Sequence, residues 1–282
     1  MLALLGSSAL SNAAPAAGGQ RAPGEGAPAR GAARSAGAVP GAAASSKAAA
    51  AQAPPDVEEV MRRLNDLYRS KRSHALMRME IKTEFYERTL TLEAWTEGLE
   101  RSLIVVRAPP REAGTATLKT EDGLWSYAPR ADRLVRIPPG LLSEAWMGSH
   151  LTNDDLVRET DFVKDYRTQG AWVEEGGRRL FEATMVPRPE APVVYTKIRY
   201  LVDPEHWVPV RAEFFDGDEV VRVMRFESLR DFGGRLLPAV MTVVPTDRPH
   251  EYTRLEYQRL EFDVRVDPSL FTPRGLRRVA KR

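Results

Sequence analysis

Cysteine is absent from the 282-residue chain, which excludes disulfides, thiolate zinc sites, iron–sulfur clusters and cysteine nucleophiles. Long hydrophobic runs are also lacking: nowhere do eighteen apolar residues follow one another, so we expect no transmembrane helix. Charge of either sign is in little excess, because 41 basic residues face 39 acidic ones. So balanced a chain lacks the electrostatic signature of a nucleic-acid-binding protein, and we expect no nucleic-acid partner.

Sequence motifs of catalytic sites are missing as well. The chain has no Gly-x-Ser-x-Gly elbow, no P-loop, no His-Glu-x-x-His and no Gly-x-Gly-x-x-Gly after a strand. The four histidines lie far apart, and none has another histidine two to four residues away: His74, His150, His206 and His250. We therefore expect no catalytic residue, no metal site and no cofactor, and we interpret the protein as non-enzymatic.

Two polar or aromatic groupings admit more than one interpretation. His150 with Asn153, Asp154 and Asp155 fits a metal site, but helix capping by Asn153 or Asp154 is favoured because Asn and Asp are preferred N-cap residues. A second group fits a carbohydrate platform or, as is more common, the lining of a core or cavity. Its members are Trp95, Trp125, Tyr127, Trp146 and Trp207.

The composition changes abruptly near residue 55. Residues 1–55 hold 21 Ala, 8 Gly, 6 Pro and 6 Ser and no aromatic residue, so they cannot bury enough apolar surface to fold. Within them, the apolar run from Leu2 to Leu10 followed by Ser11-Asn12-Ala13 has two of the three parts of a signal peptide. We predict a remnant of an export signal over 1–13, a disordered linker over 14–55 and one folded domain over 56–282.

That domain begins with a helix and continues with strands. Pro54-Pro55-Asp56 predicts an N-cap, and apolar residues then recur every three or four positions, which predicts a helix over 56–71. From residue 75 the apolar period is two, as in strands. The pattern predicts strands over 75–81, 90–95, 101–107, 114–120, 123–128, 133–137, 171–175, 178–186, 194–202, 207–215, 219–228, 235–244 and 251–262. Residues 141–147 and 153–159 look like short helical turns.

Short turns and the lack of crossover helices predict an antiparallel meander. About a dozen strands are too many for a flat sheet, so the sheet must curl or close. One face of each strand is apolar and the other is charged, which predicts one wet face and one that is covered or lines a cavity. Few helices are available as cover, which favours a curved sheet with apolar space on its concave side.

Several motifs occur in an order that is typical of one known family. They are Leu92-x-x-Trp95-x-x-Gly98, Leu124-Trp125-x-Tyr127-x-Pro129, Arg136-Ile137-Pro138-Pro139, the stretch from Trp146 to Val157, Leu201-Val202-Asp203, Phe214-Phe215-Asp216-Gly217, Leu237-Pro238 and Leu270-Phe271-Thr272-Pro273. Together they resemble the outer membrane lipoprotein-sorting protein family, a branch of the LolA/LolB-like superfamily. The resemblance covers residues 57–278. The chain departs from the family pattern at residues 150–151, where His-Leu replaces an acidic residue and Phe.

The resemblance implies a mainly β (α+β) fold, an incomplete, half-open antiparallel barrel with helices over its mouth. It also implies a periplasmic, non-catalytic carrier that binds lipid or lipoprotein acyl chains for transport toward the outer membrane. An inner-membrane transporter or an outer-membrane acceptor would then be a partner. The alternative is a periplasmic sensor of the same fold that binds a lipidated ligand and regulates a protein partner.

We predict that nine residues line the apolar cavity. They are chosen because strand alternation or the resemblance places them on the covered face. They are Met77, Met79, Ile81, Leu92, Trp125, Trp146, Tyr200, Val210 and Phe214.

Deleting residues 14–55 tests the predicted domain boundary. Because this segment has no aromatic residue with which to join a core, the thermal midpoint of the domain should stay the same. Differential scanning calorimetry of the truncated and full-length chains measures it, and a decrease of several degrees would show that the segment contributes to folding.

Overall fold

Thirteen antiparallel strands, paired mostly in chain order, form one open sheet in the computed structural model. The structure describes residues 55–157, 160–191 and 193–281. The predicted signal remnant over 1–13 and the predicted linker over 14–55, apart from Pro55, lie outside these residues. In the described part of the chain, no helix has the length and apolarity needed to cross a membrane.

The first half of the sheet comprises β1 (Arg72–Lys82), β2 (Glu87–Glu97), β3 (Arg101–Ala108), β4 (Ala116–Thr120), β5 (Gly123–Ala128) and β6 (Arg133–Arg136). The second half comprises β7 (Tyr166–Glu175), β8 (Arg178–Pro187), β9 (Lys197–Asp203), β10 (Val208–Asp216), β11 (Glu219–Asp231), β12 (Leu236–Pro245) and β13 (Tyr252–Phe262). The α-helices are α1 (Val57–Asp66), α2 (Asn153–Val157), α3 (Phe162–Asp165) and α4 (Pro273–Ala280), and the 3₁₀ helices are η1 (Pro129–Ala131), η2 (Pro139–Leu141), η3 (Trp146–Gly148) and η4 (Pro268–Phe271).

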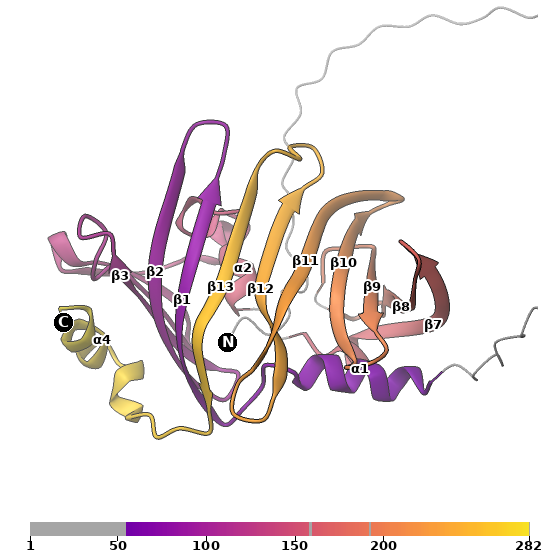
Figure 1. Ribbon diagram of the computed structural model, residues 1–282. Helices are drawn as coiled ribbons and strands as arrows, with labels where there is room; N and C mark the ends of the chain where they lie inside the picture. The colour runs from indigo at the N-terminus through magenta and orange to yellow at the C-terminus, as the bar shows by residue number, and fades with distance from the viewer. Residues whose placement is uncertain (1–54, 158–159, 192, 282) are drawn as a thin grey trace, which may run out of the picture. The chain divides into compact units, whose positions relative to one another are not determined.

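The strand order is β6-β5-β4-β3-β2-β1-β13-β12-β11-β10-β9-β8-β7 (Figure 1). Two meanders are therefore joined through the pairing of β1 with β13, and β6 and β7 lie at opposite edges. The prediction of a mainly β, half-open antiparallel sheet with few helices is confirmed.

The connection from β6 to β7 must cross a face of the sheet, because these strands lie at opposite edges. We call it the crossing segment; its described residues are 137–157 and 160–165. It contains η2, η3, α2 and α3, and its side chains Trp146, Leu151 and Phe162 are buried in the same apolar cluster as the concave-face residues of the strands.

The opposite face of the sheet is covered at one end, where a wet face was predicted. Side chains of β3, β4 and β5 pack there against η4 and α4 in a second apolar cluster. Figure 1 shows α4 next to β3. The prediction did not include α4, a helix of only eight residues, three of which are arginines.

Element boundaries differ from the predicted ones at two informative places. The first helix ends at Asp66 rather than near residue 71, because Tyr68 leaves it to stack on Tyr257, with ring centroids 5.8 Å apart, and to donate a hydrogen bond to the carbonyl of Pro238. Strand β7 begins at Tyr166 rather than 171. Gly170 lies within β7 and does not interrupt it. A Cβ at this position would lie 2.3 Å from the Phe181 ring, so glycine permits the close approach of that ring to the β7 backbone.

Replacing Gly275 by alanine should destabilise the α4 end of the sheet. An added Cβ would lie 1.8 Å from the carbonyl oxygen of Ser269, and a backbone atom cannot rotate away. We expect the free energy of unfolding to fall by about 1–3 kcal/mol in a urea titration. The matched control is Gly140→Ala, whose Cβ meets nothing within 4 Å; it should change stability by less than about 1 kcal/mol. Equal effects of the two would contradict this packing.

Candidate functional site

The concave face of the sheet holds one large apolar cluster, which we call the concave interior. Strands β1 to β3 and β8 to β13, helix α1 and the crossing segment all contribute buried side chains to it. Methionine is concentrated here: seven of the eight methionines are buried in the cluster or packed against it, namely Met61, Met77, Met79, Met147, Met185, Met224 and Met241.

Seven of the nine predicted cavity residues lie together in the concave interior: Met77, Met79, Ile81, Leu92, Trp146, Tyr200 and Phe214. All seven are almost completely shielded from solvent. None of them lines any of three pockets of 480 to 820 Å³ that open among the described residues. The structure thus places these side chains in contact within a dense cluster, and their binding role stays a prediction.

The other two predicted residues do not join them. Trp125 packs against the second cluster, because strand alternation sends it to the face covered by α4. Val210 is the extra residue of a β-bulge: Pro209 pairs with Val202 and Arg211 with Leu201, so the alternation restarts after Val210. Val210 is only half-buried for that reason.

Side chains, rather than backbone ladders, attach the crossing segment to the sheet. Among the described residues, every backbone–backbone hydrogen bond of residues 138–157 is internal to the segment, for example from Trp146 N to Leu151 O at 2.7 Å. The indole Nε1 of Trp146 donates to Thr117 Oγ1 on β4 at 3.0 Å. The carbonyls of Met147 and Gly148 accept from Arg88 and Tyr86 of the β1–β2 hairpin.

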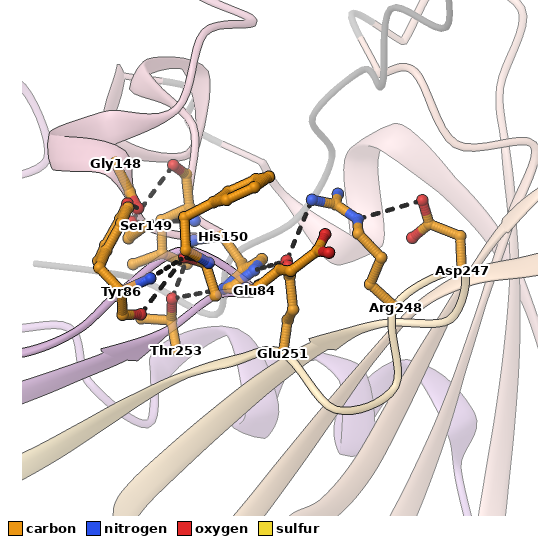
Figure 2. Close-up of polar contacts among 12 residues, drawn as sticks. Glu84, Tyr86, Gly148, Ser149, His150, Asp247, Arg248, Glu251 and Thr253 are labelled. Atoms are coloured by element: carbon orange, nitrogen blue, oxygen red, sulfur yellow. Dashed lines mark hydrogen bonds and ion pairs between the residues drawn. The ribbon is translucent and has the colours of Figure 1, made fainter.

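His150 is the central attachment, held between two residues of the β12–β13 region (Figure 2). Its backbone N–H donates to Thr253 Oγ1 at 2.9 Å, and its Nδ1 lies 2.9 Å from the same hydroxyl. Its Nε2 lies 3.0 Å from Glu251 Oε2. Glu251 accepts two further bonds, from the backbone N–H of Glu84 at 2.8 Å and from Arg248 Nη1 at 3.1 Å.

The hydrogen bond from His150 lowers the pKa of Glu251, and the bond from the Glu84 backbone and the charge of Arg248 act in the same direction. Burial acts against them, since only 3% of the Glu251 side chain is exposed. Glu251 is therefore ionised at neutral pH. The network joins the crossing segment to the β12–β13 hairpin through Glu251 and to the β1–β2 hairpin through Glu84.

A buried ion pair attaches the next turn of the crossing segment. Arg222 of β11 donates through Nη1 to both carboxylate oxygens of Asp155, each at 3.3 Å, and to the hydroxyl of Tyr195 at 3.3 Å. Burial lowers the pKa of Arg222, but the Asp155 carboxylate raises it and the net shift is upward. A charged guanidinium therefore lies inside the apolar cluster, with its carbon 5.4 Å from the centre of the Phe214 ring.

Among the described residues, three buried polar atoms of this region have no hydrogen-bond partner: Arg222 Nε, Arg222 Nη2 and the Tyr200 hydroxyl. Burial raises the pKa of Tyr200, so its hydroxyl keeps its proton and can donate. An unpaired buried hydroxyl or N–H costs about 1–3 kcal/mol. These atoms can therefore donate hydrogen bonds to a polar group that enters the concave interior.

Helix capping explains the acidic residues of α2, as the sequence favoured, but the cap is Thr152. Thr152 Oγ1 accepts from Asp155 N at 3.2 Å, and Asp155 Oδ2 accepts from Thr152 N at 2.8 Å, a reciprocal capping box.

A different set of side chains, Asp203, Glu205 and His206, brings its potential metal-ligand atoms within 4.8 Å of one another. These three are partly or fully exposed at a turn, where His206 bonds to Asp203.

Sequence reasoning missed Arg222, Glu251 and Thr253, although each carries a signal. Arg222 has the strand parity of Met224 and Phe226, two inward residues of β11. Glu251 and Thr253 share the parity of Leu255 on β13. A charged or polar residue that strand alternation places on the apolar face of a strand indicates a buried polar contact.

Comparison with known proteins supports the fold. A family model whose description reads "uncharacterized protein" matches residues 98–278. A DUF1329 family protein from Desulfovibrio piger has a TM-score of 0.68 at 20% identity, covering 78% of this chain and 97% of that chain. A Vibrio parahaemolyticus domain described as an outer membrane lipoprotein-sorting protein has a TM-score of 0.66 at 21% identity, with 78% and 97% coverage.

A LolA superfamily protein from Nitrosomonas europaea is similar over 77% of this chain and 97% of that chain, with a TM-score of 0.61 at 18% identity. No curated protein matches the sequence. The fold expected from the resemblance is therefore confirmed.

Replacing Glu251 by Gln should weaken attachment of the crossing segment in a pH-dependent manner. Because the folded-state pKa of Glu251 is lowered, its ionised form stabilises the fold above the unfolded pKa of about 4.3, and this stabilisation is lost as the pH falls through the folded-state pKa. We expect the variant to be less stable than the wild type by about 1–3 kcal/mol at pH 7 and the difference to shrink below pH 4.

Urea unfolding across this pH range measures the difference. The matched control is Glu219→Gln, an exposed carboxylate at the start of β11, which should have little effect at any pH. A Glu251→Gln deficit that does not change with pH would contradict the role of the charge.

Proposed function

The chain belongs to the family matched over residues 98–278 and has the LolA superfamily fold, and we propose that it is a non-catalytic carrier of acyl chains. The carrier works in the periplasm, holding lipid or lipoprotein acyl chains between the sheet and the crossing segment on the way toward the outer membrane. An inner-membrane transporter that loads it or an outer-membrane acceptor that unloads it is the expected partner.

One observation carries this proposal: a large apolar interior lies under a cover that is attached by side-chain contacts. The crossing segment makes no backbone ladder with the sheet in residues 138–157 of the described chain, so it can separate without breaking strand pairing. Its attachments to Thr117, Glu251 and Arg222 are discrete polar contacts. Opening them exposes apolar side chains of both surfaces, which an acyl chain can then cover.

The composition of the interior suits a ligand of variable shape. Methionine has three rotatable side-chain bonds and a polarisable sulfur, so it fills irregular spaces and repacks at little cost. Met77 and Met79 of β1, Met185 of β8, Met224 of β11 and Met241 of β12 bring such side chains to the interior from both halves of the sheet. Each buried methylene of a ligand gains about 0.8 kcal/mol.

The unpartnered donors favour a ligand with one polar end. Arg222 Nε, Arg222 Nη2 and the Tyr200 hydroxyl suit a carboxylate or the carbonyl of an ester or amide, as occurs where an acyl chain is attached. The carrier needs no covalent chemistry for this: the chain is shielded from water, and the polar end is held by hydrogen bonds that a membrane or acceptor can replace.

A Met79→Trp variant tests whether the concave interior takes up acyl chains. The larger side chain fills space on β1 without adding charge, so binding of a dansyl-labelled fatty acid should weaken about fivefold or more while the fold tolerates the change. Fluorescence titration measures binding, and calorimetry measures stability. The matched control is Leu141→Trp in the crossing segment, whose native side chain is 48% exposed; it should bind as the wild type does.

A second variant in the same titration, Tyr200→Phe, separates binding from packing. Removing a buried hydroxyl that has no partner should leave the free protein as stable or more stable, yet weaken fatty-acid binding. If the wild type takes up no fatty acid, and Met79→Trp strains the core by about 1–3 kcal/mol, the interior is a solid core and the carrier proposal fails.

A further inference from the structure

A second candidate site opens on the surface, at the end of the sheet where α1 finishes. A pocket of about 820 Å³ opens there, which we call the α1 pocket. Figure 1 shows α1 along the lower ends of the strands of the second half of the sheet. The pocket is lined by the last turns of α1 and the residues after it, and by the β2–β3, β9–β10 and β11–β12 turns.

The lining of the α1 pocket is strongly cationic. The lining contains one carboxylate, Asp66, and five side chains that are positively charged at neutral pH. The five are Arg62, Arg63, Arg69, Lys71 and Arg235. His206 adds a group that can be protonated. The whole chain carries a formal net charge of only +2, so this concentration of one sign is local.

Two of these cations are available to a ligand. Arg62 pairs with Glu59, Arg69 lies 3.8 Å from Asp66, and Arg235 lies 3.5 Å from Asp263. Arg63 and Lys71, in contrast, are exposed and have no ion-pair partner among the described residues. Both line the pocket, Arg63 in the last turn of α1 and Lys71 in the residues that follow the helix, so an anion bound in the pocket would be attracted by both.

Apart from Ser70 and Gly98, the rest of the lining is apolar: Leu67, Leu99, Trp207, Leu236 and Leu237. Leu236, the first residue of β12, is 37% exposed. Trp207 adopts a left-handed backbone conformation with φ of 55°, which is uncommon for a bulky residue, and its ring lies 5.9 Å from that of Phe181. The fold thus holds an indole in the pocket wall.

We propose that the α1 pocket binds an amphiphile that carries a phosphate group and a single hydrocarbon chain. The phosphate lies between Arg63 and Lys71, with Arg235 nearby, and the chain lies along Leu99, Trp207 and Leu236. A free anion would leave the five apolar side chains of the lining without a contact. A neutral hydrocarbon would leave the five cationic side chains without one. The cations of this site lie outside the concave interior, although Leu237 belongs to that cluster and Trp207 packs against it. The proposal does not depend on the proposed function.

Isothermal titration calorimetry of the full chain tests the site with three probes: dodecyl phosphate, inorganic phosphate and dodecyl maltoside. The two amphiphiles are used below their critical micelle concentrations. The test variant is Arg63→Gln/Lys71→Gln, which removes two exposed cations without known partners. The matched control, Arg133→Gln/Arg225→Gln, removes two exposed arginines of β6 and β11 that line none of the three pockets.

We expect dodecyl phosphate to bind the wild type and the control equally and the test variant about tenfold more weakly. Met79→Trp should leave this binding unchanged, so failure of the carrier proposal is distinguishable from failure of this one. Equal binding of inorganic phosphate would overturn the role of the hydrocarbon chain. Equal binding of dodecyl maltoside, equal affinity of the test variant, or no binding of dodecyl phosphate would overturn the site.

Discussion

The pairing of β1 with β13 is the constraint on which the rest of the structure depends. Because this pair joins the two meanders in the middle of the sheet, the strands that follow each other in the chain as β6 and β7 lie at opposite edges. The intervening residues must then traverse the sheet. They do so on the concave side, where their apolar side chains contribute to the largest cluster of the molecule. A covered apolar interior is thus a consequence of strand order.

The way the cover is attached determines what the interior can do. If the crossing segment were a strand of the sheet, backbone hydrogen bonds would hold it along its whole length. Instead, His150, Asp155 and Trp146 attach it at separate points. Buried polar contacts of this kind are costly when only one partner is present, so they favour either a fully closed cover or a fully open one. That behaviour suits reversible uptake of a hydrocarbon chain better than gradual loosening.

Most of the sheet could be predicted from the sequence, because period-two alternation is a local property of each strand. The β1–β13 pairing could not, since it joins residues some 180 positions apart and depends on which edges meet. Six of the nine predicted interior residues follow from alternation, and Trp146 of η3 follows from the family resemblance. Val210 fails because a bulge shifts the register beside it. The inward charge of Arg222 was missed because a basic residue in a strand is normally exposed.

Hydrogen exchange tests the central claim, that the crossing segment is a cover which opens separately from the sheet. The free energies of opening should differ: amides of residues 142–157 should exchange much faster than those of β1 and β13, and a bound fatty acid should slow them. The amides of Trp146 and Asp154, whose hydrogen bonds lie within the segment, are the most informative. Exchange as slow as that of the central strands, unchanged by the fatty acid, would contradict the account.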